Sequence, residues 1–408
     1  LAEAGHEVLL IERGAEPGSK NLSGGVFYCR VLAEVFRDFV DRAPVERRIT
    51  RNVLSFLNDG SHVNVDYWDA RLADPVNAVT VLRARLDPWL SAECEQAGIV
   101  VMPGVRVDGL LQEDGRFVGV RAGEDELRCH VVVAADGVNS FLAQAAGVRT
   151  KEPPGHLAVG VKSVIGLPRT VLEDRFRVSG DEGVAYAVVG DCTQGVAGGG
   201  FLYTNLDSVS VGVVLRLDDL QAAGLSSSDL HDHFLAHPAI EPLLRGGELL
   251  EYGCHLTIED GPAMADHDLT RPGLLVIGDA GGFTLNTGLT IRGMDLAAGS
   301  AIAAATAASA ALAAGDFSQQ AMDGYLRELE RSFVSADLRT YARAPGFLEN
   351  PRLYAGYGQL LADVLHGVCD HDLSPRRHLV PGALSALKAS GLRIDQLVRD
   401  GWAAARAL

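Results

Sequence analysis

Apolar and polar residues alternate in different ways along the chain, and each pattern predicts a different kind of element. Residues 6–12 form a short apolar run that predicts a strand, and residues 31–42 have the spacing of a helix. Alternation over residues 50–70, around one Asn-Asp-Gly turn, predicts an antiparallel hairpin. Residues 86–97 then predict a helix, and residues 99–134 predict strands that include a β-meander and end in a buried strand.

The second half of the chain repeats this change from strands to helices. Residues 156–215 are dominated by alternating strands, and residues 226–245 predict a helix. A buried strand at 273–277 precedes an alanine-rich helix, and everything after about residue 317 is helix and loop. This order predicts an α/β fold, in which a Rossmann-like nucleotide-binding domain is interrupted by an antiparallel β-sheet domain and followed by C-terminal helices. The expected boundaries are 1–50, 76–158 and 266–318 for the nucleotide-binding domain, 51–75 and 159–265 for the sheet domain, and 319–408 for the C-terminal helices.

Composition narrows the functions that such a fold could carry. The 408 residues include 36 basic and 53 acidic ones, and the net charge of −17 disfavours nucleic-acid binding and broad electrostatic adhesion to anionic membranes. Shallow apolar insertion into a membrane stays open. The six cysteines include no C-x-x-C pair and no cluster at iron–sulfur spacing, so we expect reduced thiols and no metal site. The uncharged stretch 296–315 is mostly alanine, which favours a buried helix over a membrane span.

Two carboxylates follow predicted strands in positions typical of nucleotide binding. Glu12 ends the first strand, where it could accept hydrogen bonds from ribose hydroxyls; the alternative is a solvated carboxylate. In the usual arrangement it lies about 20 residues after a G-x-G-x-x-G turn, which here would precede residue 1. Asp136 and Gly137 follow the strand of the β-meander, and small residues there let the backbone approach a nucleotide. An ordinary Asp-Gly turn is the alternative for this pair.

The strongest signal is a buried strand that runs into Gly278 and Asp279. A carboxylate at that point can bind a ribityl hydroxyl, and the Gly-rich loop that follows opens a long helix. The free N–H groups and dipole of that helix favour negative charge, such as that of a reduced flavin. Arg83 precedes another helix and could pair with a pyrophosphate, although a surface salt bridge would explain it equally well.

Taken together and in this order, these elements resemble the flavoprotein superfamily of geranylgeranyl reductases, aromatic hydroxylases and electron-transfer-flavoprotein–quinone oxidoreductases. Within it the chain is most similar to the FixC-type quinone oxidoreductases, over nearly its whole length. Three segments carry this likeness: Pro17 to Gly25, Val81 to Ala84, and Asn286 to Asp295.

The resemblance implies one FAD, held by a Rossmann-like domain of the glutathione-reductase type. It implies no catalytic nucleophile, because electron transfer needs none. The loop at 20–25 would line the flavin ring or the ribityl chain, and residues 288–291 would approach the pyrimidine edge from the other side. The quinone would enter through the antiparallel sheet domain, at about residues 160–265, which would form the roof over the flavin. The cofactor-binding residues that we expect are Glu12, Arg13, Lys20, Asn21, Ser23, Gly24, Gly25, Arg83, Asp136, Gly137, Gly278, Asp279, Gly288, Leu289, Thr290 and Ile291.

The resemblance also implies a place in metabolism. The protein would pass electrons from electron-transfer-flavoprotein subunits to a quinone in a Fix-type bifurcating complex linked to nitrogen fixation, with a ferredoxin-like protein as a further component. It would be cytoplasmic, with a peripheral contact at the inner face of the cell membrane. One alternative is an FAD-dependent prenyl lipid reductase. Another is an inactive, FAD-free fragment, because the first strand and the G-x-G-x-x-G turn are expected before residue 1.

Overall fold

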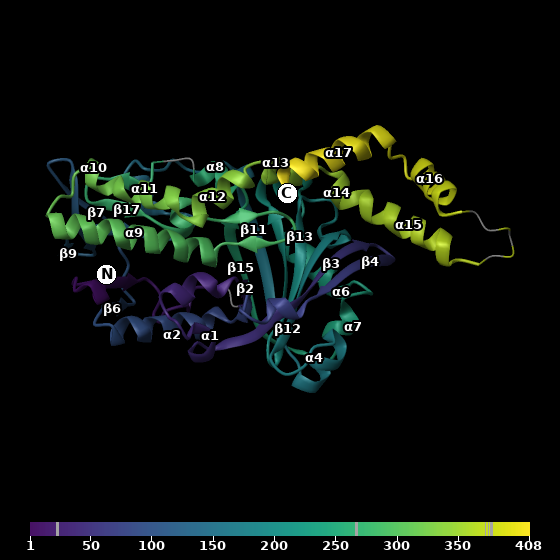
Figure 1. Ribbon diagram of the computed structural model, residues 1–408, viewed down its shortest axis with the longest axis horizontal. Helices are drawn as coiled ribbons and strands as arrows, with labels where there is room; N and C mark the ends of the chain where they lie inside the picture. Colours follow the sequence, from purple (N-terminus) through teal and green to yellow (C-terminus); the bar gives the residue numbers. More distant parts are fainter. Residues whose placement is uncertain (22–23, 266–267, 372, 374, 376–377) are drawn as a thin grey trace.

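The computed structural model describes residues 1–21, 24–265, 268–371, 373, 375 and 378–408. Figure 1 shows an elongated molecule with three parts along its length. Small sheets and the helices around α9 form one end, a large curled sheet fills the centre, and the C-terminal helices extend from the other end. The predicted α/β class with C-terminal helices is confirmed.

Two parallel strand pairs lie in the first of these parts. β1 (Leu9–Glu12) pairs with β6 (Val100–Pro103), and β10 (Val132–Ala134) pairs with β17 (Leu274–Val276). β16 (Thr270–Arg271) extends the second pair in the antiparallel direction. The predicted β-meander is also present, and its strands are β7 (Gly109–Glu113), β8 (Arg116–Ala122) and β9 (Asp125–Arg128).

The large sheet has nine strands in the order β15-β11-β14-β13-β12-β3-β5-β2, with β4 paired to β3. In chain order they are β2 (Gly25–Phe27), β3 (Val45–Asn58), β4 (Ser61–Trp68), β5 (Val79–Val81), β11 (Leu157–Gly166), β12 (Glu182–Gly190), β13 (Gly198–Thr204), β14 (Ser208–Arg216) and β15 (Glu248–Ile258). The pairing is antiparallel except between β3 and β12, which run parallel. The sheet is therefore mixed, in contrast to the purely antiparallel sheet expected, because β3 and β12 are distant in sequence and no tight turn dictates their direction.

The strand alternation sorts side chains onto the two faces of this sheet. On one face Val161, Val211 and Val213 are fully buried beneath α4 (Arg169–Phe176) and α6 (Ser227–Ala236). On the opposite face of the same strands lie Lys162 and Ser210, because successive residues of a strand point to opposite sides. The apolar face forms the core, and the polar face is left for other contacts.

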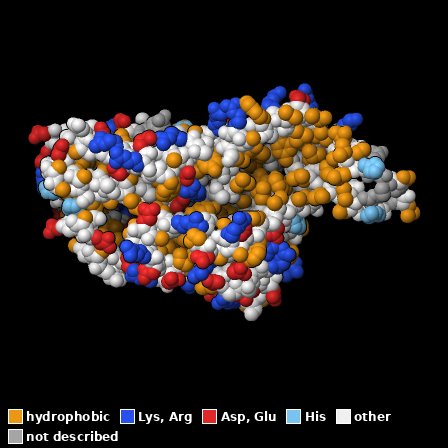
Figure 2. Space-filling view, viewed as in Figure 1, with side chains coloured by type: hydrophobic (Ala, Val, Ile, Leu, Met, Phe, Trp, Pro, Cys, Tyr) orange, Lys and Arg blue, Asp and Glu red, His pale blue; other side chains and the backbone are white. Residues whose placement is uncertain are grey.

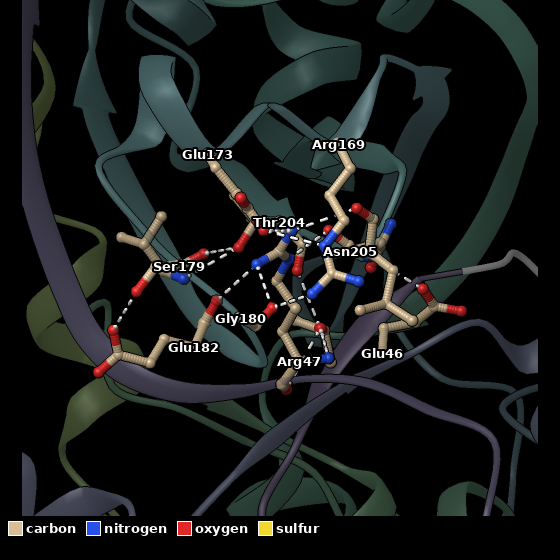
Figure 3. Close-up of polar contacts among 12 residues, drawn as sticks. Glu46, Arg47, Arg169, Glu173, Ser179, Gly180, Glu182, Thr204 and Asn205 are labelled. Carbon is tan, nitrogen blue, oxygen red and sulfur yellow. Dashed lines mark hydrogen bonds and ion pairs between the residues drawn. The ribbon is translucent and has the colours of Figure 1, made fainter. Parts of the chain in front are cut away.

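Arg47 on β3 ties the large sheet together from inside, as Figure 3 shows. Its side chain is 0% exposed, and its guanidinium donates to the carbonyl oxygens of Asn205 at 2.6 Å, Glu182 at 2.9 Å and Gly180 at 3.1 Å. It also donates to the carbonyl of Leu206 at 3.2 Å and contacts Glu173 at 3.5 Å. These partners come from loops far apart in the sequence, so one side chain joins β3, β12 and the β13–β14 turn.

Helix α9 (Met294–Ala314) crosses the first part of the molecule. Nine of its residues are buried at helical spacing, and α10 (Gln319–Met322), α11 (Gly324–Arg331) and α12 (Phe333–Thr340) pack against it. Among the described residues it is the one helix long and apolar enough to cross a membrane by length and composition. The same properties are typical of a core helix rich in alanine, which lets neighbouring helices approach closely.

The predicted helix at 31–42 is wrong in one respect. The segment is a 3-10 turn at Cys29–Glu34 followed by a separate short helix, α1 (Phe39–Arg42). The break brings two rings against Trp89 of α2 (Arg83–Gln96): the Phe36 centroid lies 5.4 Å from that of Trp89, and the Phe39 centroid lies 5.8 Å from it. Burial of both rings against one partner therefore overrides a continuous helix.

The other helices fill the edges and the C-terminal part. They are α2 (Arg83–Gln96), α3 (Phe141–Ala145), α5 (Leu217–Ala223), α7 (Glu241–Leu244), α8 (Gly261–Ala265), α13 (Ala344–Leu348), α14 (Arg352–Ala355), α15 (Tyr357–Cys369), α16 (Leu379–Ala389) and α17 (Ile394–Ala407). Arg352 of α14 donates to both carboxylate oxygens of Asp400 on α17, at 2.6 and 2.7 Å, and this pair anchors α17 to the body. Helix α15 packs against β3 and β4.

Candidate functional site

The parallel pairing of β10 with β17 brings two of the predicted motifs to one edge. Asp136 follows β10, and Gly278 and Asp279 follow β17. Arg149 joins the two loops, because its guanidinium donates to the carbonyl of Ala280 at 2.6 Å and to that of Val138 at 3.3 Å. Two segments about 140 residues apart in the sequence therefore form one loop cluster, as expected at the carboxyl ends of parallel strands.

The Asp136 carboxylate is occupied by its own loop. It accepts a hydrogen bond from the Ser140 hydroxyl at 2.7 Å and another from the backbone N–H of Leu142 at 3.0 Å, which caps α3. These contacts match the ordinary turn that the sequence left open. The role of Asp136 and Gly137 in binding a nucleotide stays a prediction.

Asp279 has a different environment. Its carboxylate is 3.5 Å from the Thr284 hydroxyl, a weak contact. Burial raises the pKa of Asp279, although the charges of Arg83 and then His255 oppose the rise. A partly buried carboxylate with so little local hydrogen bonding is suited to accept from the hydroxyl groups of a ligand. The ribityl chain of FAD has such hydroxyls, so this residue fits the group that the sequence predicts.

Arg83 begins α2 and lies among the side chains of the first loop. Its guanidinium pairs with Asp87 one helical turn later, at 2.6 and 2.8 Å, and Asp87 also accepts from the Asn21 side chain at 2.5 Å. This arrangement is partly the salt bridge that the sequence left open. The Arg83 side chain is still one-third exposed, so it can also meet an anionic ligand.

Gly24 and Gly25 connect the first loop to the large sheet through β2 and β5. Gly24 has φ +83°, and a Cβ at this position would collide with the hydroxyl of Ser210 on β14. Its carbonyl accepts a hydrogen bond from the Lys162 ammonium group of β11. The loop therefore lies directly against the polar face of the sheet, and only glycine fits at residue 24.

Sequence reasoning missed Lys162. Its nitrogen lies 5.7 Å from the centroid of the Phe201 ring, and burial lowers the pKa of the lysine to about 8. This pKa already includes the charge of Glu251 on β15, which raises it, and the smaller effect of Arg83, which lowers it. The available signal was a lysine in the middle of an otherwise apolar alternating strand, where charged residues seldom occur.

The predicted loop at 288–291 is the tip of a short hairpin between β18 (Leu285–Asn286) and β19 (Ile291–Arg292). The Thr287 and Thr290 hydroxyls are 3.2 Å apart across the turn, while Leu289 is 54% exposed. Gly288 has φ +75° and lies against Leu348 of α13. The hairpin therefore presents an apolar tip beside the C-terminal helices.

Glu259 supports this hairpin and was also missed. Its carboxylate accepts from the Asn286 amide at 3.3 and 3.4 Å and is 4% exposed. Burial raises the pKa of Glu259 to about 7, because a charged carboxylate is poorly solvated there.

The remaining predicted residues lie apart from this group or carry few contacts. Glu12 ends β1, and its carboxylate accepts from the backbone N–H of Gly14. Arg13 and Lys20 are exposed, and Ser23 lies outside the described residues. Within the described part of the chain, no recorded hydrogen bond or ion pair joins Glu12 to Arg83 or Asp279. The structure thus brings together Gly24, Arg83 and Asp279 with Lys162.

The arrangement offers charged groups and glycine backbone for a large polar ligand. Among the described residues no group of three or more His, Cys, Asp or Glu could hold a metal ion. The described cysteines are all free thiols. Binding and electron transfer through a cofactor are chemistry that this site can support.

Comparison with known proteins gives the family. Residues 1–178 match the model of an FAD binding domain. The chain is 44% identical over 409 residues to the probable electron transfer flavoprotein-quinone oxidoreductase YdiS of Escherichia coli K12, an alignment that covers 100% of this chain and 95% of that protein. The chain belongs to the electron transfer flavoprotein–quinone oxidoreductase family. Protein FixC of the same strain is 42% identical over 365 residues, covering 89% of this chain and 85% of FixC.

Membership of this family confirms that the protein is an FAD-dependent oxidoreductase, as the sequence predicts. A solved structure of a geranylgeranyl bacteriochlorophyll reductase-like protein from Thermoplasma acidophilum has a similar fold. Its TM-score is 0.72 at 19% identity, over 98% of this chain and 94% of that one. At that identity the likeness shows the fold alone.

Proposed function

We propose that this protein passes electrons from an electron transfer flavoprotein to a quinone through a bound FAD. The observation that carries the proposal is the identity of 44% to YdiS over almost the full length of both proteins, because YdiS is named for this reaction. We further propose that the protein acts in a Fix-type bifurcating complex with a ferredoxin-like protein, which the likeness to FixC supports.

The residues of the loop cluster have separate tasks in this proposal. Asp279 accepts hydrogen bonds from the ribityl hydroxyls, and Arg83 pairs with the pyrophosphate. Glu12, at the end of β1, accepts from the ribose hydroxyls. The N-terminus of α9 and the hairpin tip meet the pyrimidine edge. FAD, when bound, supplies the electron storage that these side chains cannot provide.

A quinone partner requires access from the membrane, and the C-terminal helices present a suitable face. Figure 2 shows apolar side chains gathered over α15, α16 and α17. We call this face the C-terminal apolar surface. Its exposed members are Leu361, Leu365, Val368, Leu379, Val380, Leu384, Ile394, Val398 and Trp402. On α17 the three exposed apolar residues, Ile394, Val398 and Trp402, recur every four residues, which places them on one side of the helix.

The charge of this region favours contact with a bilayer. Residues 351–408 carry seven Lys or Arg and five Asp or Glu, whereas the rest of the chain carries 29 and 48. Trp402 is 64% exposed and stacks beneath the Arg406 guanidinium at 4.4 Å, an arrangement suited to the interface between lipid and water. We propose a peripheral contact of this surface with the inner face of the cell membrane.

The C-terminal apolar surface is also connected to the proposed flavin edge. Helix α13 packs against α17 and carries Leu348, which lies against Gly288 of the hairpin. Leu289 and Ile291 of the same hairpin are exposed apolar residues. A quinone that enters along the C-terminal helices would therefore arrive at the hairpin, close to the cofactor.

The function is tested by mixing FAD-loaded protein with a reduced electron transfer flavoprotein and a short-chain quinone. We expect the electron transfer flavoprotein to be oxidised only when both this protein and the quinone are present. The absorbance of its flavin measures this oxidation. Oxidation that proceeds equally without the quinone would contradict the proposal. A prenyl lipid added in place of the quinone tests the alternative reductase, which no observation beyond a shared fold favours.

The membrane contact is tested by sedimentation with vesicles of anionic phospholipid. Replacing Val398 and Trp402 with aspartate should reduce the bound fraction at least several-fold, because two charges would enter the apolar face. The matched control replaces exposed Val65 and Tyr67 of β4 with aspartate and should leave binding unchanged. Equal binding of the α17 variant and the unchanged protein would refute a contact through α17.

A further inference from the structure

The proposed function gives Lys162 no role, although this residue contacts one of the proposed cofactor-binding residues. It lies on the polar face of β11, and its ammonium group donates to the carbonyl of Gly24 in the first loop. The same loop lies against Asp87, which pairs with Arg83, and Arg83 influences Asp279. Lys162 therefore contacts the first loop directly, and the charge of Arg83 acts on both Lys162 and Asp279.

Charged groups from several elements face this lysine. Arg83 approaches from α2, and Glu251 approaches from β15. Phe201 of β13 lies beneath its nitrogen, with Tyr203 stacked on Phe201 at 4.8 Å. Burial and Arg83 disfavour the charged lysine, and Glu251 favours it, with the result that its pKa falls to about 8. A lysine in this range exchanges its proton readily near neutral pH, unlike an exposed lysine.

The proposed reaction needs such a proton carrier. Two-electron reduction of FAD near neutral pH takes up one proton and leaves one negative charge on the ring system. Conversion of a quinone to a quinol takes two electrons and two protons. The cofactor thus carries both electrons but one of the two protons, and the second must come from a group beside it or from solvent.

We propose that Lys162 holds the second proton of this exchange. The Lys162 ammonium ion would balance the negative charge of reduced FAD; above about pH 8, where the amine is neutral before reduction, it would first take this proton from solvent. On reoxidation the quinone would take two electrons and one proton from the cofactor and a second proton from Lys162, and below about pH 8 solvent would then return a proton to the amine. This role rests on the proposed function, and Lys162 would act on the cofactor without forming a covalent bond.

The test is the FAD midpoint potential of the purified holoprotein, measured against redox dyes between about pH 6 and 10. Below about pH 8 Lys162 is protonated in both redox states, and reduction takes up one proton. Above that pH the oxidised protein has a neutral lysine, while negative charge on reduced FAD keeps it protonated. The potential should then fall about twice as steeply with pH, because two protons accompany two electrons.

Three variants separate Lys162 from other groups. Lys162→Arg keeps a cation that does not titrate, so its slope should not change across the range. Lys162→Met should likewise show one slope, at a lower potential, because reduced FAD loses its counter-charge. The control Lys151→Met removes an exposed lysine and should behave like the unchanged protein. If Lys162→Met binds no FAD, the unchanged protein and Lys162→Arg still decide the question.

A single slope in the unchanged protein overturns the proposal, and so does a steeper limb that persists in Lys162→Arg. The measurement uses chemical reduction and needs neither the flavoprotein partner nor a quinone. Failure to reduce quinone with a normal change of slope would therefore count against the proposed function. Normal quinone reduction with a single slope would count against Lys162.

Discussion

Two groups of charged residues, one around Arg47 on the large sheet and one around Gly24 and Asp279, differ in how their polar atoms are satisfied. Around Arg47 the protein supplies every partner: four carbonyl oxygens, from the β13–β14 turn, the loop before β12 and the start of β12, surround the guanidinium together with the Glu173 carboxylate. Around Gly24 and Asp279 the charged groups mostly influence one another at a distance, and the Asp279 carboxylate has one weak hydroxyl contact.

The difference teaches how to separate a structural cluster from a candidate binding site. A buried ion with a full set of partners stabilises one arrangement of the chain, and removing it lowers the free energy of unfolding directly. A buried ion with few partners raises the free energy of the protein alone and becomes favourable when a ligand supplies the missing hydrogen bonds. The first kind should govern unfolding, and the second should govern cofactor affinity and pH dependence.

The largest effect should come from Arg47→Met. The substitution removes one donor from each of four carbonyl groups, of which that of Asn205 lies in a fully buried residue, and we expect the free energy of unfolding to fall by about 4 kcal/mol. Chemical denaturation followed by circular dichroism measures it. Arg169→Met is the matched control, since Arg169 also contacts Glu173 and Gly180 but is half exposed, and it should lower stability by less than about 1 kcal/mol. Equal losses would mean that burial does not distinguish the two arginines.

A smaller effect, dependent on pH, should come from Glu259→Gln. The pKa of Glu259 is raised to about 7 in the folded protein, from an ordinary 4.5. Below about pH 4.5 folded and unfolded chains are both protonated. As pH rises to 7 the unfolded chain releases its proton first, so the stability contributed by protonated Glu259 falls.

Between pH 4.5 and 7 the free energy of unfolding of the unchanged protein should therefore fall by up to about 3 kcal/mol relative to that of Glu259→Gln. One pKa unit corresponds to about 1.4 kcal/mol. Glutamine keeps an oxygen that can accept from Asn286 and does not ionise. Urea denaturation at several pH values measures the difference. A stability difference that stays constant with pH would show that Glu259 is not held in its neutral form.

The smallest of the three effects concerns FAD affinity. Asp279→Ala should weaken FAD binding by about 2 kcal/mol, roughly 30-fold, because the carboxylate would no longer accept from the ribityl chain. Stability of the protein without FAD should rise slightly, since a poorly solvated charge is removed. Fluorescence quenching of added FAD measures the affinity, with Asp174→Ala on exposed α4 as control. Unchanged affinity in Asp279→Ala would remove this residue from the binding site.

Several local features could be predicted from sequence because they depend on neighbours along the chain. The hairpin of β3 and β4 follows from strict alternation around one turn. The strand before Gly278 follows from an apolar run bounded by glycines, and α9 follows from a long alanine-rich segment. The FAD family could be recognised because its motifs keep their order even when they lie far apart.

Other features depended on contacts that no local pattern contains. The parallel direction of β12 beside β3 and the break between Cys29–Glu34 and α1 follow from packing against distant residues. Lys162 and Glu259 gained their importance from burial by other elements, and an isolated charge in a strand does not indicate its partners.

The sequence by itself therefore determined the fold class and the cofactor, because hydrophobic period and motif order are properties of the chain. Only the tertiary structure decided which charges are satisfied within the protein and which remain to receive a ligand. The physical reason is that desolvation and hydrogen-bond partners come from residues distant in sequence, so the environment of Arg47, Asp279 or Lys162 exists only after the sheet has formed.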